Sequence, residues 1–291
     1  MTPMATPEQT QTQVCYRHPR AETAVSCSNC GRPICTDCMV FSAVGIKCPE
    51  CAGTPTGTKK AATKVRAVGR ASPYGVTEVL VGILVLVFLG QLAVSGGHVA
   101  STEDTLFQRG ALAGFKLEEG EWWRLATNAF LHGSFLHIFF NVLMLWWLGR
   151  PLEALLGRNR FTAIFFISIL TGSAGALLLT DPFQATIGAS GAVFGILGAG
   201  IVLEREHINV FGGSALVIAV FNLALGFVLT NVSIGGHVGG LVGGALTVLV
   251  LSHFGRGHAV YGRVDFVSIA GLVAIAAGSL VVAYLRVRGY A

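Results

Sequence analysis

Four polar residues interrupt long apolar stretches of this 291-residue chain: Ser190, His237, and the pair His137 and Asn141. Each is a candidate functional residue, because polar groups inside a bilayer cost free energy. His237 could act as a general base that takes the proton from Ser190 as this serine attacks a carbonyl carbon. His137 and Asn141, four residues apart, share one helix face and could donate hydrogen bonds to the oxyanion. No carboxylate is near in the sequence, so the pattern predicts acyl transfer by a dyad.

Each of these residues also has a simpler interpretation when it is taken alone. Asn141 or His137 could make a hydrogen bond between helices, and the small residues around Ser190 could serve helix packing. Gly-Ser-Ala-Gly around Ser173 nearly repeats the composition of Gly-Ala-Ser-Gly around Ser190. The combination of the four residues is therefore more informative than any one of them.

A second set of chemically active residues lies in the first 51 residues, which hold all seven cysteines. With one histidine they form four pairs of the same spacing: Cys15 and His18, Cys27 and Cys30, Cys35 and Cys38, Cys48 and Cys51. Eight ligands are enough for two tetrahedral zinc sites. The odd number of cysteines and an expected cytoplasmic location argue against a disulfide framework. Four protein ligands leave no open position on an ion, so both zinc ions are expected to be structural.

The cysteine-rich head resembles a B-box-type, cross-braced zinc finger. In that arrangement the first and third pairs share one ion, and the second and fourth pairs share the other. The resemblance implies one site of Cys15, His18, Cys35 and Cys38, and another of Cys27, Cys30, Cys48 and Cys51. Pairing of adjacent pairs remains chemically acceptable. Such heads usually bind partners, so we expect an unidentified cytoplasmic partner; a role like that of a membrane ubiquitin-ligase adaptor is an alternative for the head alone.

The rest of the chain has the composition of a membrane protein. Hydrophobic residues make up 53% and charged residues 12%, whereas soluble domains have about 25% charged residues. A spanning helix needs about 20 mostly apolar residues. Charges divide the apolar region into seven predicted spans, at about 77–95, 128–149, 160–180, 187–203, 212–230, 235–253 and 265–285. We therefore expect an all-α polytopic membrane protein.

The distribution of Lys and Arg predicts how these spans are oriented. With the head in the cytoplasm, the inner segments hold most of the basic residues. These are the Lys and Arg residues of a basic linker at 54–75, followed by Arg150, Arg158, Arg160, Arg205, Arg256 and Arg263. The acidic 103–121 segment is then outside. Only Arg286 and Arg288, near the outward C-terminus, depart from the rule that basic residues lie inside. Membrane orientation thus explains the net charge of +5, and no nucleic-acid partner is expected. Ser190 and His237 would each lie about one turn below the outer face, where they could meet in a cavity open to water.

Together these residues resemble the rhomboid family of intramembrane serine proteases. The resemblance covers roughly residues 77–253 and rests on Trp123-Arg124, His132, His137-x-x-x-Asn141, Gly188-Ala-Ser190-Gly191 and Gly236-His237-x-x-Gly240-x-x-x-Gly244. It implies Ser190 as the nucleophile, His237 as the base, His137 and Asn141 as oxyanion donors, and no catalytic cofactor. It also implies cleavage of transmembrane substrates near the outer face of a bacterial-type plasma membrane, at small residues.

The resemblance divides the chain into a zinc head at 1–53, a basic linker at 54–75, a six-span core at 76–255, and an inner loop, seventh span and tail at 256–291. It implies that Gly240 and Gly244 let the sixth span press against the fourth. Many bacterial relatives have a tyrosine where this chain has Phe194, which keeps the ring and loses the hydroxyl. Trp122, Trp123 and Arg124 would anchor the first outer loop at the membrane interface.

Two other classes of function remain as alternatives. A rhomboid-like pseudoprotease would bind transmembrane clients without cleaving them, although retention of both Ser190 and His237 argues against it. A transporter or channel would line a continuous path with polar residues. Here the polar residues gather near the predicted outer face, which favours the protease.

Overall fold

The computed structural model describes residues 13–42, 45–52, 75–101, 103–228, 232–252 and 264–288. The chain divides into two compact units, Met1–Pro73 and Tyr74–Ala291, which we describe separately. The predicted basic linker, except for Gly75, and most of the predicted inner loop lie outside the described residues.

The first unit contains two small antiparallel hairpins and one short helical turn. Strand β1 (Gln13–Val14) pairs with β2 (Glu22–Thr23), and β3 (Val40–Ser42) pairs with β4 (Gly45–Lys47), with η1 (Thr36–Cys38) between them. Its buried cluster consists of Ile34 and five cysteines, Cys15, Cys27, Cys35, Cys38 and Cys48. Such a small core can hardly stabilise a fold without additional cross-links.

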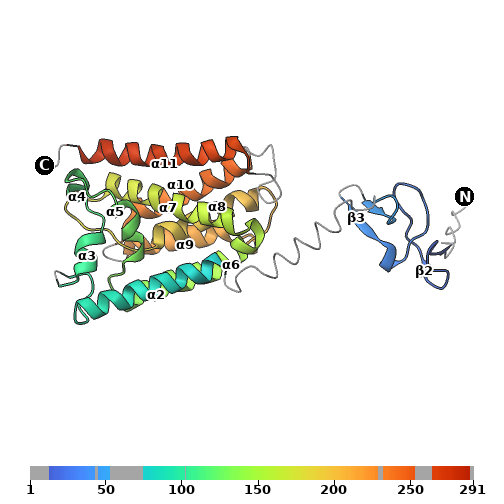
Figure 1. The fold of residues 1–291 in the computed structure, drawn as a ribbon, viewed down its shortest axis with the longest axis horizontal. Coiled ribbons are helices and arrows are strands. Elements are labelled where there is room, and N and C mark those ends of the chain that lie inside the picture. The colour runs from blue at the N-terminus through green and yellow to red at the C-terminus, as the bar shows by residue number, and fades with distance from the viewer. Residues whose placement is uncertain are drawn as a thin grey trace, which may run out of the picture. The chain divides into compact units, whose positions relative to one another are not determined.

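The second unit is a bundle of long helices (Figure 1). In the described residues these are α2 (Val76–Val94), α6 (Phe135–Leu156), α7 (Arg158–Leu179), α8 (Ser190–Arg205), α9 (Ala215–Val228), α10 (Ile234–Leu251) and α11 (Phe266–Val287). Five of them are long and apolar enough to cross a membrane; α8 and α9, of 16 and 14 residues, are shorter. The predicted all-α, multi-pass membrane fold is confirmed, and the number of seven spans stays a prediction.

The segment between α2 and α6, described at residues 95–101 and 103–134, is called the α2–α6 loop, and its described part contains four short elements. They are α3 (Thr105–Gly110), α4 (Gly114–Glu118), α5 (Arg124–Thr127) and η2 (Asn128–Phe130), and Figure 1 shows α3, α4 and α5 at one end of the bundle. The predicted start of the second span at residue 128 was wrong. Helix α6 begins at Phe135 because the Ser134 hydroxyl caps it, accepting a hydrogen bond from the His137 amide at 3.1 Å.

Glycines allow α10 to pack directly against the backbones of α7 and α8. A methyl group placed on Gly240 would lie 1.9 Å from the carbonyl oxygen of Gly191, and one placed on Gly244 would lie 1.8 Å from that of Gly195. A methyl group on Gly175 of α7 would lie 2.3 Å from the Gly235 carbonyl oxygen. The structure thus shows the close approach of α10 to α8 that the family resemblance implied.

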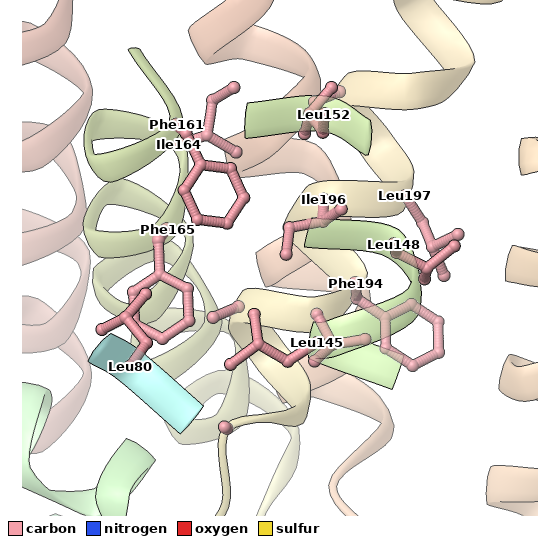
Figure 2. Packing of buried hydrophobic residues seen from close by; sticks show 14 of the residues in the cluster. Leu80, Leu145, Leu148, Leu152, Phe161, Ile164, Phe165, Phe194, Ile196 and Leu197 are labelled. Carbon is pink, nitrogen blue, oxygen red and sulfur yellow. The ribbon is translucent and has the colours of Figure 1, made fainter. Parts of the chain in front are cut away.

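Large apolar side chains fill the space between α6, α7 and α8 (Figure 2). Those labelled there, together with Leu80 of α2, are Leu145, Leu148, Leu152, Phe161, Ile164, Phe165, Phe194, Ile196 and Leu197. This core fixes α8, the helix that begins with Ser190, relative to α6, the helix that carries His137.

Glu153 of α6 caps the start of α2. Its carboxylate accepts hydrogen bonds from the Val76 amide at 2.6 Å, the Thr77 amide at 2.8 Å and the Thr77 hydroxyl at 2.7 Å. A carboxylate is stabilised at a helix N-terminus by the unpaired amides and the helix dipole. This contact joins the first helix of the bundle to the second long helix.

Candidate active site

The structure brings Ser190 and His237 into contact. Ser190 is the first residue of α8, and His237 lies in the first turn of α10, which the Ser233 hydroxyl caps. The His237 Nε2 atom lies 2.9 Å from the Ser190 Oγ atom, a normal hydrogen-bond distance. His237 is 8% exposed and Ser190 is partly exposed. The pair therefore has the distance and the partial access that a nucleophile and its base require.

Packing, rather than a carboxylate, holds the His237 ring. The ring stacks on Phe194, with centroids 4.2 Å apart and an interplanar angle of 15°. Its Nδ1 atom has no hydrogen-bond partner among the described residues, and a methyl group placed on Gly226 of α9 would lie 3.7 Å from it. A neutral ring protonated at Nδ1 leaves Nε2 free to accept the Ser190 proton. Phe194 thus stacks on the His237 ring, and no carboxylate is hydrogen-bonded to this ring among the described residues.

His137 lies against the turn that precedes Ser190. Gly188 in this turn has a φ of +117°, and a methyl group placed on it would lie 2.6 Å from the His137 Nε2 atom. Only glycine fits such a backbone conformation without strain. Asn141, 6% exposed, donates a side-chain hydrogen bond to the His137 carbonyl oxygen at 2.9 Å. The structure therefore brings His137 to the Ser190 turn and places Asn141 one helical turn along α6.

His132 packs behind His137. The two rings meet edge to face with centroids 5.0 Å apart, and His132 is fully buried. The His132 amide donates to the side-chain oxygen of Gln91 at 3.0 Å, and the Gln91 amide donates to Asp104 at 2.7 Å. This buried network connects α2, the N-cap of α3 and the segment before α6.

Asn128 is a residue of the site region that the sequence analysis missed. Its side chain donates to the Arg124 carbonyl at 2.6 Å and to the Ser173 hydroxyl at 2.9 Å. Its carbonyl oxygen accepts a hydrogen bond from the Gly188 amide at 2.9 Å. The sequence did contain a signal for Asn128, because it is a strongly polar residue at the first position of the predicted 128–149 span.

Arg124 is turned into the protein instead of toward an interface. It is 4% exposed, and its guanidinium donates to the Ala111 carbonyl at 2.6 Å and to the Gln108 carbonyl at 2.7 Å. The expectation that Arg124 acts as an interfacial anchor was therefore wrong, because these carbonyls of the α2–α6 loop need a buried donor. Trp123 is 55% exposed and donates from its ring to the Arg109 carbonyl at 3.0 Å.

The ligand pairs of the head form two candidate metal centres. Within each group the ligand atoms all lie within 4.8 Å of one another, and the groups are Cys15, His18, Cys35 and Cys38, and Cys27, Cys30, Cys48 and Cys51. This is the grouping that the cross-braced resemblance implies. The cysteines are free, and sets of three or four thiolates in a tetrahedral group suit zinc.

In the group of Cys15, His18, Cys35 and Cys38, the pKa values of two thiols are shifted in opposite directions. Desolvation, followed by the nearby Cys15 and Cys35 thiols, raises the pKa of Cys38 to about 11. Desolvation also acts on Cys15, but hydrogen bonds from the Cys35, Arg17 and His18 backbone outweigh it and lower the pKa of Cys15 to about 6. Crowded thiolates repel one another without a cation, so these residues fit a bound metal ion.

The fold and the comparisons define the class of protein to which this chain belongs: it is a member of the rhomboid family. The Rhomboid domain family matches residues 119–254. The chain is 34% identical over 145 residues to YdcA of Bacillus subtilis (strain 168), a protein named for the same family, covering 47% of this chain and 72% of YdcA.

Two further relatives are named as rhomboid proteases. The chain is 34% identical over 208 residues to GluP of Bacillus subtilis (strain 168), covering 70% of this chain and 39% of GluP. It is 36% identical over 136 residues to GlpG of Serratia proteamaculans (strain 568), covering 43% of this chain and 46% of GlpG. The chain thus matches less than half the length of these two relatives.

Proposed function

We propose that this protein is an intramembrane serine endopeptidase that cleaves transmembrane proteins near the outer membrane face. The observation that carries the proposal is the 2.9 Å contact between Ser190 Oγ and His237 Nε2 at the start of two buried helices. Kinship with proteins named rhomboid proteases supports it. In this function Ser190 is the nucleophile and His237 is the general base.

The reaction proceeds through two acyl transfers. Ser190 Oγ attacks the scissile carbonyl carbon while its proton passes to His237 Nε2. The tetrahedral intermediate breaks the C–N bond, and His237 returns the proton to the departing amine, which leaves an ester on Ser190. Water, deprotonated by His237, then attacks the ester; the carboxylic acid leaves, and Ser190 regains its proton from His237.

The oxyanion is expected to be stabilised from two directions. Ser190 is the first residue of α8, and the first amides of a helix have no acceptor within the helix. These amides and the helix dipole favour negative charge at that position. His137, which contacts Gly188, and Asn141 donate from α6 on the other side. The side chains of His137 and Asn141 thus supplement donors that the backbone already provides.

Capture of Ser190 by a serine-directed fluorophosphonate tests the proposal. The reagent is expected to label the protein in liposomes, with the label located on the peptide that contains Ser190. Because the base is needed for attack, His237→Ala is expected to prevent labelling. A protein that binds transmembrane clients but is neither labelled nor able to cleave them would instead be a pseudoprotease.

The head is proposed to carry two structural zinc ions and to bind a cytoplasmic partner or regulate the protease. Metal analysis of the full-length protein is expected to give two zinc ions per chain, since two four-ligand groups are present. Cys30→Ser is expected to lower the stoichiometry toward one. Chelation is expected to unfold residues 13–52, because metal binding supplies much of the folding free energy of such small domains.

A protease-protection assay of this region measures the unfolding. The bundle provides the internal control, since its melting temperature is expected to be unchanged by the chelator. One zinc ion per wild-type chain, or a head that resists protease in excess chelator, would contradict the two-site assignment.

We further propose that the head lies in the cytoplasm and the C-terminus outside. The Lys and Arg distribution supports this orientation. Reporter fusions at Gly69 and Ala291 are expected to fall on opposite sides of the membrane. Reporters on the same side would require an even number of spans, and the proposed depth of Ser190 would then be wrong.

A further inference from the structure

The C-terminal end of α11 shares a core with the α2–α6 loop. Figure 1 shows α4 beside this end of α11. The Tyr284 ring of α11 lies 6.3 Å from the Trp122 ring of the loop, at an angle of 33°. A buried cluster unites the two segments with α7, and its members are Leu112, Leu117, Leu125, Ala176, Leu177, Ala283 and Val287.

The same loop is hydrogen-bonded to the segment that leads into Ser190. Leu112 and Thr186 form an antiparallel bridge, in which the Leu112 amide donates to the Thr186 carbonyl at 3.0 Å and the Thr186 amide donates to the Leu112 carbonyl at 2.8 Å. The rings of Phe115 and Phe183 stack with centroids 5.5 Å apart. Leu112, a member of the cluster beside α11, is therefore hydrogen-bonded to Thr186, which lies only four positions before Ser190.

A second connection runs through Asn128. Leu125, another member of the cluster, accepts a hydrogen bond from the Ser173 hydroxyl at 2.8 Å. Ser173 in turn accepts one from Asn128, whose carbonyl holds the Gly188 amide at 2.9 Å. Thus two independent sets of hydrogen bonds join the loop to the turn of Ser190.

We propose that α11 positions the nucleophile, with Tyr284 and Trp122 as positioning residues. The ring contact, with Ala283 and Val287 of the buried cluster, holds the α2–α6 loop. The loop in turn holds the backbone of residues 182–190 in the place where Ser190 Oγ meets His237. Neither ring contacts the dyad, so both act through the Leu112–Thr186 bridge and Asn128. This inference rests on the proposed protease function and assigns to the helix beyond the six-span core a part in catalysis.

The structure allows the ring contact to be removed without detaching α11. Gly271 holds the helix closely against α10, since a methyl group there would lie 2.6 Å from Val250. Ala283 and Val287, which belong to the buried cluster, are not altered by a change at Tyr284. The two rings, with Leu280 and Val281, line an apolar hollow of about 400 Å³. Few neighbouring atoms can therefore replace a lost ring.

The variants Tyr284→Ala and Tyr284→Leu test the proposal against the control Leu285→Ala, whose side chain is 62% exposed on the same helix. In both Tyr284 variants kcat for a transmembrane substrate is expected to fall about 10- to 100-fold with little change in KM, as for a small misplacement of a reacting group. Tyr284→Phe is expected to keep kcat near the wild-type value, because the contact joins two rings and needs no hydroxyl.

Hydrogen exchange of residues 182–188 provides a readout independent of activity. Exchange there is expected to quicken in Tyr284→Ala and to stay as in wild type in Leu285→Ala and Tyr284→Phe. Unchanged exchange, or a kcat loss shared equally with Leu285→Ala, would overturn the inference. An inactive wild-type protein would refute the proposed function, and the exchange data would still decide whether α11 holds the segment.

Discussion

Replacing Ser190 or His237 by alanine is expected to abolish cleavage of a transmembrane substrate that has small residues near its outer end. The loss is expected to exceed about 1,000-fold for either variant, because a nucleophile and its base act as one unit. Expression is expected to stay near wild type. The melting temperature is expected to be unchanged in Ser190→Ala, whose side chain is partly exposed, and to fall in His237→Ala only by the cost of losing one buried ring that stacks on Phe194. Cleavage by purified protein in liposomes measures the effect.

Ser279→Ala is a suitable control for Ser190→Ala. Ser279 lies in α11, and among the described residues its hydroxyl bonds to the Ile275 carbonyl of its own helix. Ser173, in a similar Gly-Ser-Ala-Gly context, is a less neutral choice, because it bonds to both Asn128 and Leu125. An active Ser190→Ala protein beside an inactive Ser173→Ala protein would show that the dyad had been misassigned.

Smaller losses are expected at the proposed oxyanion donors. His137→Ala and Asn141→Ala are each expected to lower kcat by about 100- to 1,000-fold, the usual cost of one donor. Backbone donors at the start of α8 remain in both variants. The comparison with the dyad variants thus separates stabilisation of the oxyanion from formation of the nucleophile.

Gly244→Ala is expected to be among the most disruptive single-methyl substitutions in the described part of the bundle. Its methyl group would lie 1.8 Å from the Gly195 carbonyl oxygen, which is backbone and cannot move aside like a side chain. Helices α8 and α10 must then separate, at a cost of at least about 2 kcal/mol. Since α10 also carries His237, activity is expected to fall together with the melting temperature.

Gly82→Ala provides the matched control for this substitution. A methyl group on Gly82 of α2 would meet nothing within 4 Å, and alanine favours a helix over glycine by about 1 kcal/mol. Its melting temperature is expected to equal or exceed that of wild type. If Gly244→Ala melted like Gly82→Ala and remained active, the close approach of α8 and α10 would not hold the dyad together.

The parts of the fold that depend on local sequence were predictable. Runs of apolar residues place the long helices, whereas the face of α10 that meets α8 was implied by the family resemblance. Ser190 and His237 are 47 positions apart, yet the expected depth of their spans was enough to predict that they meet. The pairs of candidate metal ligands follow from their spacing, whereas their grouping came from a resemblance.

The parts that depend on contacts between distant segments were not predictable. Asn128 lies in a 3-10 segment before α6, where it bonds to Ser173 and Gly188 from distant parts of the chain. The Ser134 cap, in contrast, is a local signal that the sequence analysis overlooked. The inward position of Arg124 depends on carbonyls of a loop that folds back on itself. Hydropathy describes an average over a window, so it could not distinguish a buried loop from the first turns of a span.

The cap on α2 has a consequence for gene fusions that join a different head to the membrane bundle. Glu153, which belongs to α6, supplies the hydrogen-bond acceptors at Val76 and Thr77. The bundle therefore contains its own signal for where the first helix begins. Such a boundary lets a gene fusion exchange one head for another while the membrane part keeps its register.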